Sequence, residues 1–385
     1  MSGMRSPLAA LWCAAIACAC SAAPQVPAAK ASDPPPSAQR PVPTAATQVE
    51  DAGVASANPD SPAVAAPASE TATPDAGPPA LTAQDVLALA PSVSTSVGSP
   101  GAGEVRGAVA LPDHGPGFRF NERRPYAARF GTVELVQALI NAAAAGPVED
   151  VVVVNDLGLE NGGPIRQHGS HQNGRDVDVL FFSLDTKGKP VPSVGVPVDP
   201  KGRGIDFKDL AVANDDVNLR FDAKRTWRFV AALIEATGTD LQRIFIVEHV
   251  RTMLLAEAER VKAPKKIKER FEMITCQPET PHDDHMHIRL FCSAEDIAAG
   301  CIDGSPMMPF RRQALKKLGV APVLENYAAR HERTRREGVD ERTTSMEEAR
   351  AKIETSGPMH PRVRRFLDER EAWAKKPSPG RPYCK

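Results

Sequence analysis

The sequence is poor in aromatic residues, and one long segment has none at all. Only 3 Trp, 3 Tyr and 13 Phe occur among 385 residues, and the segment from Ser21 to Gly117 contains no Phe, Tyr, Trp or Cys. Up to about Pro91 this segment consists mainly of Ala, Pro, Ser, Thr and acidic residues. Such a composition cannot bury enough apolar surface to offset the conformational entropy lost on folding. We therefore expect a disordered linker over residues 21–92.

The N-terminus also lacks an apolar run long enough to span a bilayer. The run from Leu8 to Ala17 follows Arg5 and is typical of the apolar core of an export signal, so residues 1–20 are predicted to be a signal peptide. Cys18 and Cys20 follow small residues, as in a bacterial lipoprotein cleavage site. Lipid attachment there and ordinary cleavage after Ala23 are both open at this stage, and either outcome places the mature chain outside the cytoplasm.

Strong net charge is absent too. The formal net charge is −1, which gives no support for binding to nucleic acid. After residue 304 the composition becomes highly charged, with interleaved Arg, Lys and Glu in residues 330–351 and 362–376. This pattern is typical of solvated helices. We predict a charged, mostly helical C-terminal extension over residues 305–385.

Cysteine is scarce, with four residues downstream of the predicted signal region: Cys276, Cys292, Cys301 and Cys384. An even number in an exported protein indicates two disulfides, for which three pairings are possible. We favour Cys292 with Cys301 and Cys276 with Cys384. None of the four has the spacing of a zinc ribbon.

Histidine, in contrast, is concentrated in two short segments. Five of the nine histidines fall in residues 168–178 and 281–290. In the second segment a period of two puts His285, His287 and Arg289 on one face of a strand. The first segment ends in a similar alternation, which sends Asp176 and Asp178 to the face opposite Val177. Two neighbouring strands could therefore bring His171, Asp178 and His287 together.

These residue types are suited to zinc. A catalytic zinc takes imidazole nitrogen and carboxylate oxygen from three protein ligands and keeps a position for water. The remaining histidines would then be available for proton transfer and charge stabilisation. The alternative is that the histidines cap loops or pair on a surface. Two dense segments with matching strand patterns favour the metal site.

The segments around the histidines predict an α+β domain over residues 93–304. Apolar spacing favours helices from Thr132 to Ala145 and from Asp222 to Thr237. Short β-rich runs occur at 151–154, 176–182, 243–247 and 284–291. Because helices and strands do not alternate regularly, we expect one mainly antiparallel central sheet flanked by helices that carries the site.

At this point the sequence resembles the penicillin-insensitive murein endopeptidases of Gram-negative bacteria, which are related to D-alanyl-D-alanine carboxypeptidases and lysostaphin-like zinc peptidases. The resemblance runs from about Val93 to Cys301. It rests on Ser170-His171-Gln172-x-Gly174-x-Asp176-Val177-Asp178, His282-Asp283-x-His285-x-His287-Ile288-Arg289, Gly162-Gly163-Pro164, Gly131-Thr132-x-Glu134-Leu135 and Arg243-Ile244-Phe245-Ile246. Two positions depart from the family pattern: Pro281 replaces a usual glycine, and Asp284 replaces a usual aromatic residue.

The resemblance implies a zinc ion held by His171, Asp178 and His287. It implies that His285 is the catalytic histidine and that His168 and His282 complete the site. The activity implied is hydrolysis of D-alanyl to diamino-acid (meso-diaminopimelate) crosslinks in periplasmic peptidoglycan, insensitive to β-lactams because no serine nucleophile is used.

Two alternatives accompany this interpretation. A D,D-carboxypeptidase or dipeptidase on the same scaffold would need a cation for a free terminal carboxylate, for which Arg166, Arg175 and Arg289 are candidates. An inactive, tethered wall-binding protein would keep the site without the activity, but no predicted ligand is missing.

Overall fold

The computed structural model describes residues 81–165, 168–278, 280–326, 346–355 and 357–374, together with Cys384. All of them belong to one compact unit, residues 73–385. The predicted signal peptide, Cys18, Cys20 and most of the predicted linker lie outside the described residues. No helix among the described residues has the length and apolar character needed to cross a bilayer.

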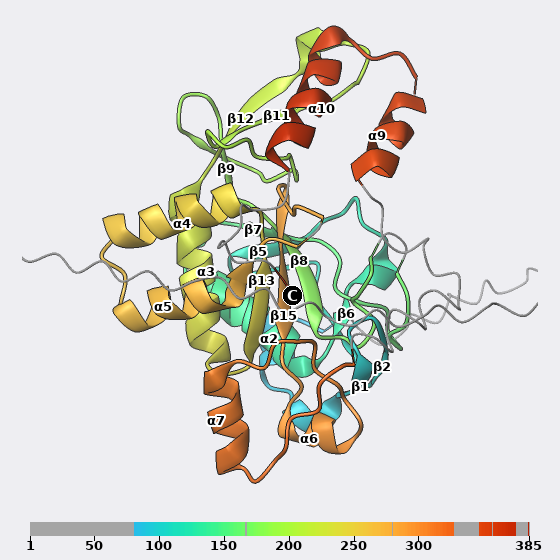
Figure 1. Ribbon diagram of the computed structural model, residues 1–385, viewed down its shortest axis with the longest axis vertical. Coiled ribbons are helices and arrows are strands. Elements are labelled where there is room, and N and C mark those ends of the chain that lie inside the picture. The colour runs from blue at the N-terminus through green and yellow to red at the C-terminus, as the bar shows by residue number, and fades with distance from the viewer. Residues whose placement is uncertain are drawn as a thin grey trace, which may run out of the picture. The chain divides into compact units, whose positions relative to one another are not determined.

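The helices and strands are interspersed along the chain, as predicted (Figure 1). The α-helices are α1 (Ala83–Leu87), α2 (Val133–Ala144), α3 (Ala223–Thr237), α4 (Glu248–Arg260), α5 (Lys265–Ile274), α6 (Ala294–Ala298), α7 (Pro309–Lys317), α9 (Met346–Thr355) and α10 (Pro361–Trp373). The strands are β1 (Thr95–Ser99), β2 (Ala102–Arg106), β3 (Val109–Ala110), β4 (His114–Gly115), β5 (Phe118–Phe120), β6 (Phe130–Gly131), β7 (Val152–Val154), β8 (Asp176–Leu180), β9 (Ser183–Leu184), β10 (Pro190–Val191), β11 (Arg203–Asp206), β12 (Val217–Phe221), β13 (Leu241–Phe245), β14 (Thr275–Cys276) and β15 (His285–Leu290).

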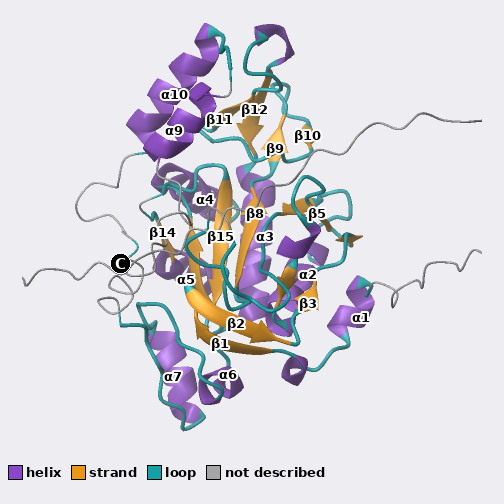
Figure 2. Cartoon of the chain, turned by 90° about the vertical axis from the view of Figure 1, so that its right-hand side faces the viewer, coloured by secondary structure: helices purple, strands orange, loops and turns teal. Residues whose placement is uncertain are grey.

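The central sheet has seven strands in the order β14-β13-β15-β8-β7-β5-β4. Its middle strands β13, β15, β8 and β7 are antiparallel to their neighbours within this group, whereas β14 pairs with β13 and β5 pairs with β7 in parallel. The predicted α+β class with a mainly antiparallel sheet is therefore confirmed. Figure 2 shows α2 and α3 behind this sheet.

The two predicted helices form because each has a cap and an apolar stripe. The side chain of Thr132 accepts a hydrogen bond from the Leu135 N–H at the start of α2, and that of Asp222 accepts one from the Arg225 N–H at the start of α3. Gly238 ends α3 with a φ of 55°, a backbone conformation that suits glycine. The buried residues of both helices join the apolar face of β8 and β15 in one core.

The disulfides and the described part of the C-terminal extension can be compared with the predictions from the sequence. Cys292 is bonded to Cys301 and Cys276 to Cys384, so both favoured pairings are confirmed. The described part of the extension is helical in α7, α9 and α10, while most of residues 330–351 lies outside the described residues. The four-stranded sheet β10-β9-β12-β11, which is inserted between β8 and α3, was not predicted.

The predicted boundary of the linker at residue 92 is wrong for its last residues. Helix α1 begins with a capping box between Thr82 and Asp85, and Val86 is fully buried in the core. Gln137 of α2 donates hydrogen bonds to the carbonyl groups of Val86 and Leu89. The composition argument missed this helix because a single buried valine and a capping box suffice to dock one turn and a half of helix.

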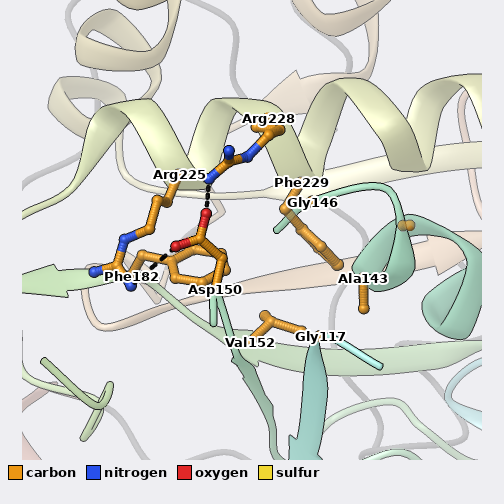
Figure 3. Close-up of a pocket in the computed structure, with 10 residues that line it drawn as sticks. Gly117, Ala143, Gly146, Asp150, Val152, Phe182, Arg225, Arg228 and Phe229 are labelled. Atoms are coloured by element: carbon orange, nitrogen blue, oxygen red, sulfur yellow. Dashed lines mark ion pairs between the residues drawn. The ribbon is translucent and has the colours of Figure 1, made fainter. Parts of the chain in front are cut away.

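A small pocket lies between α2, α3 and β7, and it holds a partly buried ion pair instead of any predicted site residue (Figure 3). Asp150 contacts the guanidinium groups of Arg228 and Arg225 there. The lining also includes Ala143 and Phe229. This contact fastens the segment between α2 and β7 to α3, so we assign the pocket a structural role.

We predict that α1 is part of the folded unit. A chain that starts at Ser92 should be less stable than one that starts at Leu81, because it loses the burial of Val86. Val86→Ala alone should lower the free energy of unfolding by about 2 kcal/mol. Denaturant unfolding measures both effects, and Leu81→Ala is the control because Leu81 is 44% exposed. Equal stability of the Val86→Ala and Leu81→Ala variants would contradict the docking of α1.

Candidate metal centre

The register of two central strands places the predicted site residues opposite one another. In the antiparallel pair of β8 and β15, His287 lies across from Asp178, Arg289 from Asp176 and His285 from Leu180. The alternation predicted from the sequence is therefore present. The opposite face of the same strands carries Val177, Val179, Met286 and Ile288, which are fully buried. Burial of that face fixes the register, because a slip by one residue would turn the histidines into the core.

The first histidine segment is a loop that folds back beside β8. His171 has a φ of 69°, a left-handed conformation that is uncommon for residues other than glycine. Its N–H donates to Asp176 Oδ2 at 3.2 Å, and its ring Nδ1 donates to the carbonyl oxygen of Leu157 at 2.6 Å. Gly158 permits this approach, since a Cβ there would lie 2.9 Å from the Phe130 carbonyl oxygen and 3.2 Å from that of His171. Backbone strain at a functional site is a common cost of preorganisation.

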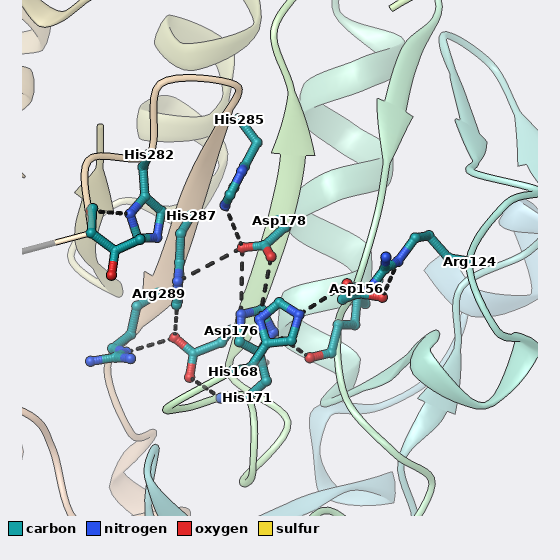
Figure 4. Close-up of polar contacts among 12 residues, drawn as sticks. Arg124, Asp156, His168, His171, Asp176, Asp178, His282, His285, His287 and Arg289 are labelled. Carbon is teal, nitrogen blue, oxygen red and sulfur yellow. Dashed lines mark hydrogen bonds and ion pairs between the residues drawn. The ribbon is translucent and has the colours of Figure 1, made fainter. Parts of the chain in front are cut away.

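Four imidazoles converge on the carboxylate of Asp178 (Figure 4). The distances to Oδ1 are 3.4 Å from His171 Nε2, 3.5 Å from His285 Nε2 and 3.7 Å from His287 Nδ1. His168 Nδ1 lies 3.6 Å from the other oxygen, Oδ2. Residues from two strands and one loop thus meet around one buried carboxylate.

Each converging histidine uses its other ring nitrogen as a donor. His168 Nε2 bonds to Asp156 at 3.0 Å, His285 Nδ1 to Asp284 at 2.6 Å and His287 Nε2 to Asp176 at 2.7 Å. His171 completes the pattern through its bond to a carbonyl oxygen. In the neutral tautomers these bonds leave the inner nitrogens with a lone pair. Metal-binding histidines are held in this way, with the outer N–H on a carboxylate or carbonyl.

Two inner atoms are buried without hydrogen-bond partners in the part of the chain that the structure describes: His171 Nε2 and Asp178 Oδ1. An unsatisfied buried lone pair and an unsatisfied carboxylate oxygen are unfavourable unless a cation satisfies both. The ligand atoms of His168, His171 and Asp178 all lie within 4.8 Å of one another. This group shares two members with the predicted set His171, Asp178 and His287. The residues present fit a metal ion.

The second histidine segment brings His282 to the edge of the same group. Its backbone is also left-handed, with a φ of 52°, and its Nδ1 donates to the carbonyl oxygen of Thr280 at 2.7 Å. Its ring centroid lies 4.9 Å from that of His285 and 5.6 Å from that of His287. Among the described residues no hydrogen bond or ion pair joins it to Asp178, so it is a neighbour of the cluster, while His168 belongs to it.

The surroundings drive the histidine pKa values in opposite directions. Burial lowers the pKa of His285, but the carboxylates of Asp178 and Asp284 outweigh it and raise the pKa to about 9. Burial dominates at His287 and lowers its pKa to about 4, against the effect of Asp176. Burial and the nearby positive charge of His285 lower the pKa of His282 to about 3. His285 and His287 lie on the same strand but differ strongly in pKa, so they can take different roles in the site.

Several supporting contacts were not predicted from the sequence, although Arg289 was placed on the same strand face as the histidines. Arg124 makes two contacts with Asp156, which in turn accepts from His168. Arg289 Nε donates to Asp176 at 2.6 Å, and its guanidinium lies 5.1 Å from the ring centroid of Phe245. Nothing in the spacing of Arg124 or Asp156 signals this role, because they come from separate loops. Asp284 could have been suspected from its place next to His285.

Comparison with known proteins identifies relatives of the chain. Residues 96–312 match the family described as penicillin-insensitive murein endopeptidase. A curated protein of that name from Klebsiella pneumoniae is 26% identical over 211 residues, covering 53% of this chain and 68% of the relative. One from Haemophilus influenzae is 28% identical over 214 residues, covering 53% and 65%.

A third relative with the same name, from Pectobacterium atrosepticum, is 31% identical over 156 residues, which is 38% of this chain and 46% of the relative. The family match spans more than half of the chain and includes both histidine segments, β8 and β15. The chain therefore belongs to the penicillin-insensitive murein endopeptidase family.

Proposed function

We propose that this protein is a zinc-dependent D,D-endopeptidase that hydrolyses D-alanyl to diamino-acid crosslinks in peptidoglycan. The observation that carries the proposal is the convergence of four imidazoles on Asp178, with His171 Nε2 and Asp178 Oδ1 both lacking hydrogen-bond partners among the described residues. The family match supports the peptide bond as the target, and the names of the relatives support murein as the substrate.

His171, Asp178 and His287 would hold the metal. Their nitrogen and oxygen donors are those that zinc takes in catalytic sites, and three protein ligands leave a position for water. Burial keeps the pKa of His287 low, so its imidazole is neutral and can donate a lone pair. When bound, zinc supplies Lewis acidity, which makes a water molecule more acidic and polarises the scissile carbonyl.

His285 is the proposed proton carrier. It shares the strand face of His287 but lies one pleat repeat away, and only 22% of its side chain is exposed. Asp284 holds its Nδ1–H, so Nε2 is directed toward the centre of the cluster. His168 is fixed by Asp156 on the other side of Asp178, and the ring of His282 lies tilted against that of His285. These two are proposed to complete the site beside the metal.

The carboxypeptidase alternative receives less support from the structure. Arg175 is buried and bonded to Asp296 at 2.6 Å, and Arg289 is bonded to Asp176. Both candidate cations are thus occupied by carboxylates of the protein. Arg166 lies outside the described residues. An internal crosslink, which needs no cation for a free terminus, fits this arrangement better.

The location follows from the proposed substrate. Crosslinked peptidoglycan is reached from the periplasm, and a signal peptide at residues 1–20 would deliver the chain there. A lipid on Cys18 would add a membrane anchor. These proposals rest on the sequence, since both features precede the described residues.

We predict that His171→Ala and His287→Ala lose zinc and activity together, because each removes one lone-pair donor from a three-ligand site. His168→Ala should keep its zinc, since His168 faces the other oxygen of Asp178. Metal analysis of the purified variants measures this directly. Unchanged zinc in His287→Ala with loss in His168→Ala would instead assign the metal to His168, His171 and Asp178.

His285→Ala should keep its zinc but lose about 10²- to 10⁴-fold in rate, the usual contribution of a positioned acid or base. Zinc content and turnover of a muropeptide dimer are measured on the same preparation. A variant nearly as active as the parent would show that another histidine, His168 or His282, carries the proton.

Product analysis tests the reaction itself. The protein is incubated with crosslinked muropeptide dimers, with and without a chelator, and the products are identified by mass. An endopeptidase yields monomers and is silenced by the chelator. Release of terminal D-alanine alone would establish the carboxypeptidase, and absence of any product from zinc-loaded protein would favour the wall-binding alternative.

A further inference from the structure

Helix α10 of the C-terminal extension contacts the loop that carries His282 and leads into β15. Arg370 Nε donates to Asp283 Oδ2 at 2.9 Å and its Nη2 donates to Oδ1 at 2.6 Å. Trp373 Nε1 donates to Oδ2 at 3.1 Å. A two-pronged guanidinium–carboxylate contact fixes both distance and orientation, more strictly than a single hydrogen bond does.

Asp283 is a charged residue with no exposed surface. Within the described ranges, its side-chain hydrogen bonds all come from α10. A buried carboxylate is tolerated only when it is paired and hydrogen-bonded. Asp283 can therefore be buried in this loop because α10 supplies its partners.

The loop around Asp283 is otherwise held by its backbone. The carbonyl oxygen of His282 accepts from the N–H of Val247 at 3.1 Å, and that of Asp283 accepts from the N–H of Val198 at 2.7 Å. His282 has a left-handed backbone, which a free loop would relax. The next two residues, Asp284 and His285, are joined side chain to side chain. Asp283 therefore lies between His282 and the Asp284 side chain that orients His285, so its placement affects both rings.

Helix α10 has anchors of its own that do not involve Asp283. Met359, Val363 and Leu367 form a second apolar cluster against Phe207 and Leu210 of the inserted region. Arg362 contacts Asp216 at 3.0 Å, and Gln277 donates to the carbonyl oxygen of Ala374 at 3.4 Å. The disulfide between Cys276 and Cys384 ties the chain beyond α10 to β14. The helix is thus a fixed support for the loop, and Figure 2 shows it beside β11 and β12.

We propose that Arg370 and Trp373 are positioning residues, which act through Asp283 to hold His282 and His285 in their working arrangement. Helix α10 lies beyond residues 96–312, the part matched by the family, so this support comes from the chain's own extension. The proposal rests on the proposed function, because it concerns the histidine assigned to proton transfer.

Arg370→Ala tests the proposal in the full chain, with Arg365→Ala as the matched control. Arg365 lies on the exposed side of the same helix. Arg370→Ala should keep its zinc and show a 10- to 100-fold lower kcat with little change in KM, the effect typical of residues that orient active-site histidines. Amide exchange at Val198 and Val247 should be faster, because their acceptors lie on the loop. Arg365→Ala should behave as the parent.

A second variant separates positioning from general stability. Arg370→Ala leaves a buried charge without its partner, which destabilises the protein by itself. The double variant Asp283→Asn, Arg370→Gln removes both charges. It should recover most of the thermal stability while kcat stays low, and Arg370→Lys, which cannot make the two-pronged contact, should recover only part of kcat. Recovery of kcat in parallel with stability would overturn the proposal.

The proposed endopeptidase function and the positioning role of α10 can be tested separately. A zinc-loaded parent that does not cleave muropeptide dimers would overturn the proposed function, but the exchange rates at Val198 and Val247 and the ring nitrogen NMR shifts of His282 and His285 would still respond to Arg370→Ala. If these are unchanged in a folded Arg370→Ala protein, or if it loses its zinc along with its activity, helix α10 does not position the histidines.

Discussion

The structure depends on one buried negative charge. Asp178 is 3% exposed and lies in the middle strand pair of the sheet, where a carboxylate without compensation would be strongly unfavourable. Nearby histidines, foremost His285 and His171, outweigh the effect of burial and hold its pKa well below the usual range. The surrounding carboxylates of Asp156, Asp176 and Asp284 each orient one of the imidazoles. With Asp178 these make four carboxylates, against the guanidinium groups of Arg124 and Arg289. The negative charge that remains favours a bound cation, which the donor set of His168, His171 and Asp178 also fits.

Support for these charges comes from segments that are far apart in the sequence. Asp176 accepts from the backbone of His171, the ring of His287 and the guanidinium of Arg289, and thereby joins the loop to both strands. Asp156 joins the same loop to Arg124. Because each outer partner fixes one ring, the inner nitrogens are directed before any ligand arrives, and little reorganisation is needed on binding.

The sequence predicted those features of the site and fold that depend on patterns over a few neighbouring residues. Alternation placed Asp178 and His287 on facing strands, and the pairing in the sheet realises it. Capping residues located α2 and α3 for the same reason, since a cap acts within one turn. Contacts between distant loops carry no such signal, so Arg124, Asp156 and Arg370 were not found. Helices α4 and α5 were missed because charged residues cover their exposed faces, and α1 because its single buried residue, Val86, lies in a segment of low apolar content.

One of the two departures noted in the second histidine segment, Asp284, has an electrostatic role. Asp284, at a position where an aromatic residue is usual, accepts from His285 Nδ1, and with Asp178 it raises the pKa of that histidine. An added carboxylate makes His285 a stronger base but also adds negative charge beside Asp283. The guanidinium of Arg370 faces this pair of acidic residues, and its attraction helps to lower the pKa of Asp284 to about 2, after the larger effect of His285 overcomes burial. Arg370 of the extension and Asp284 of the loop are therefore parts of one charge arrangement. Without α10, the loop would carry the adjacent carboxylates of Asp283 and Asp284, and the buried one, Asp283, would be unpaired.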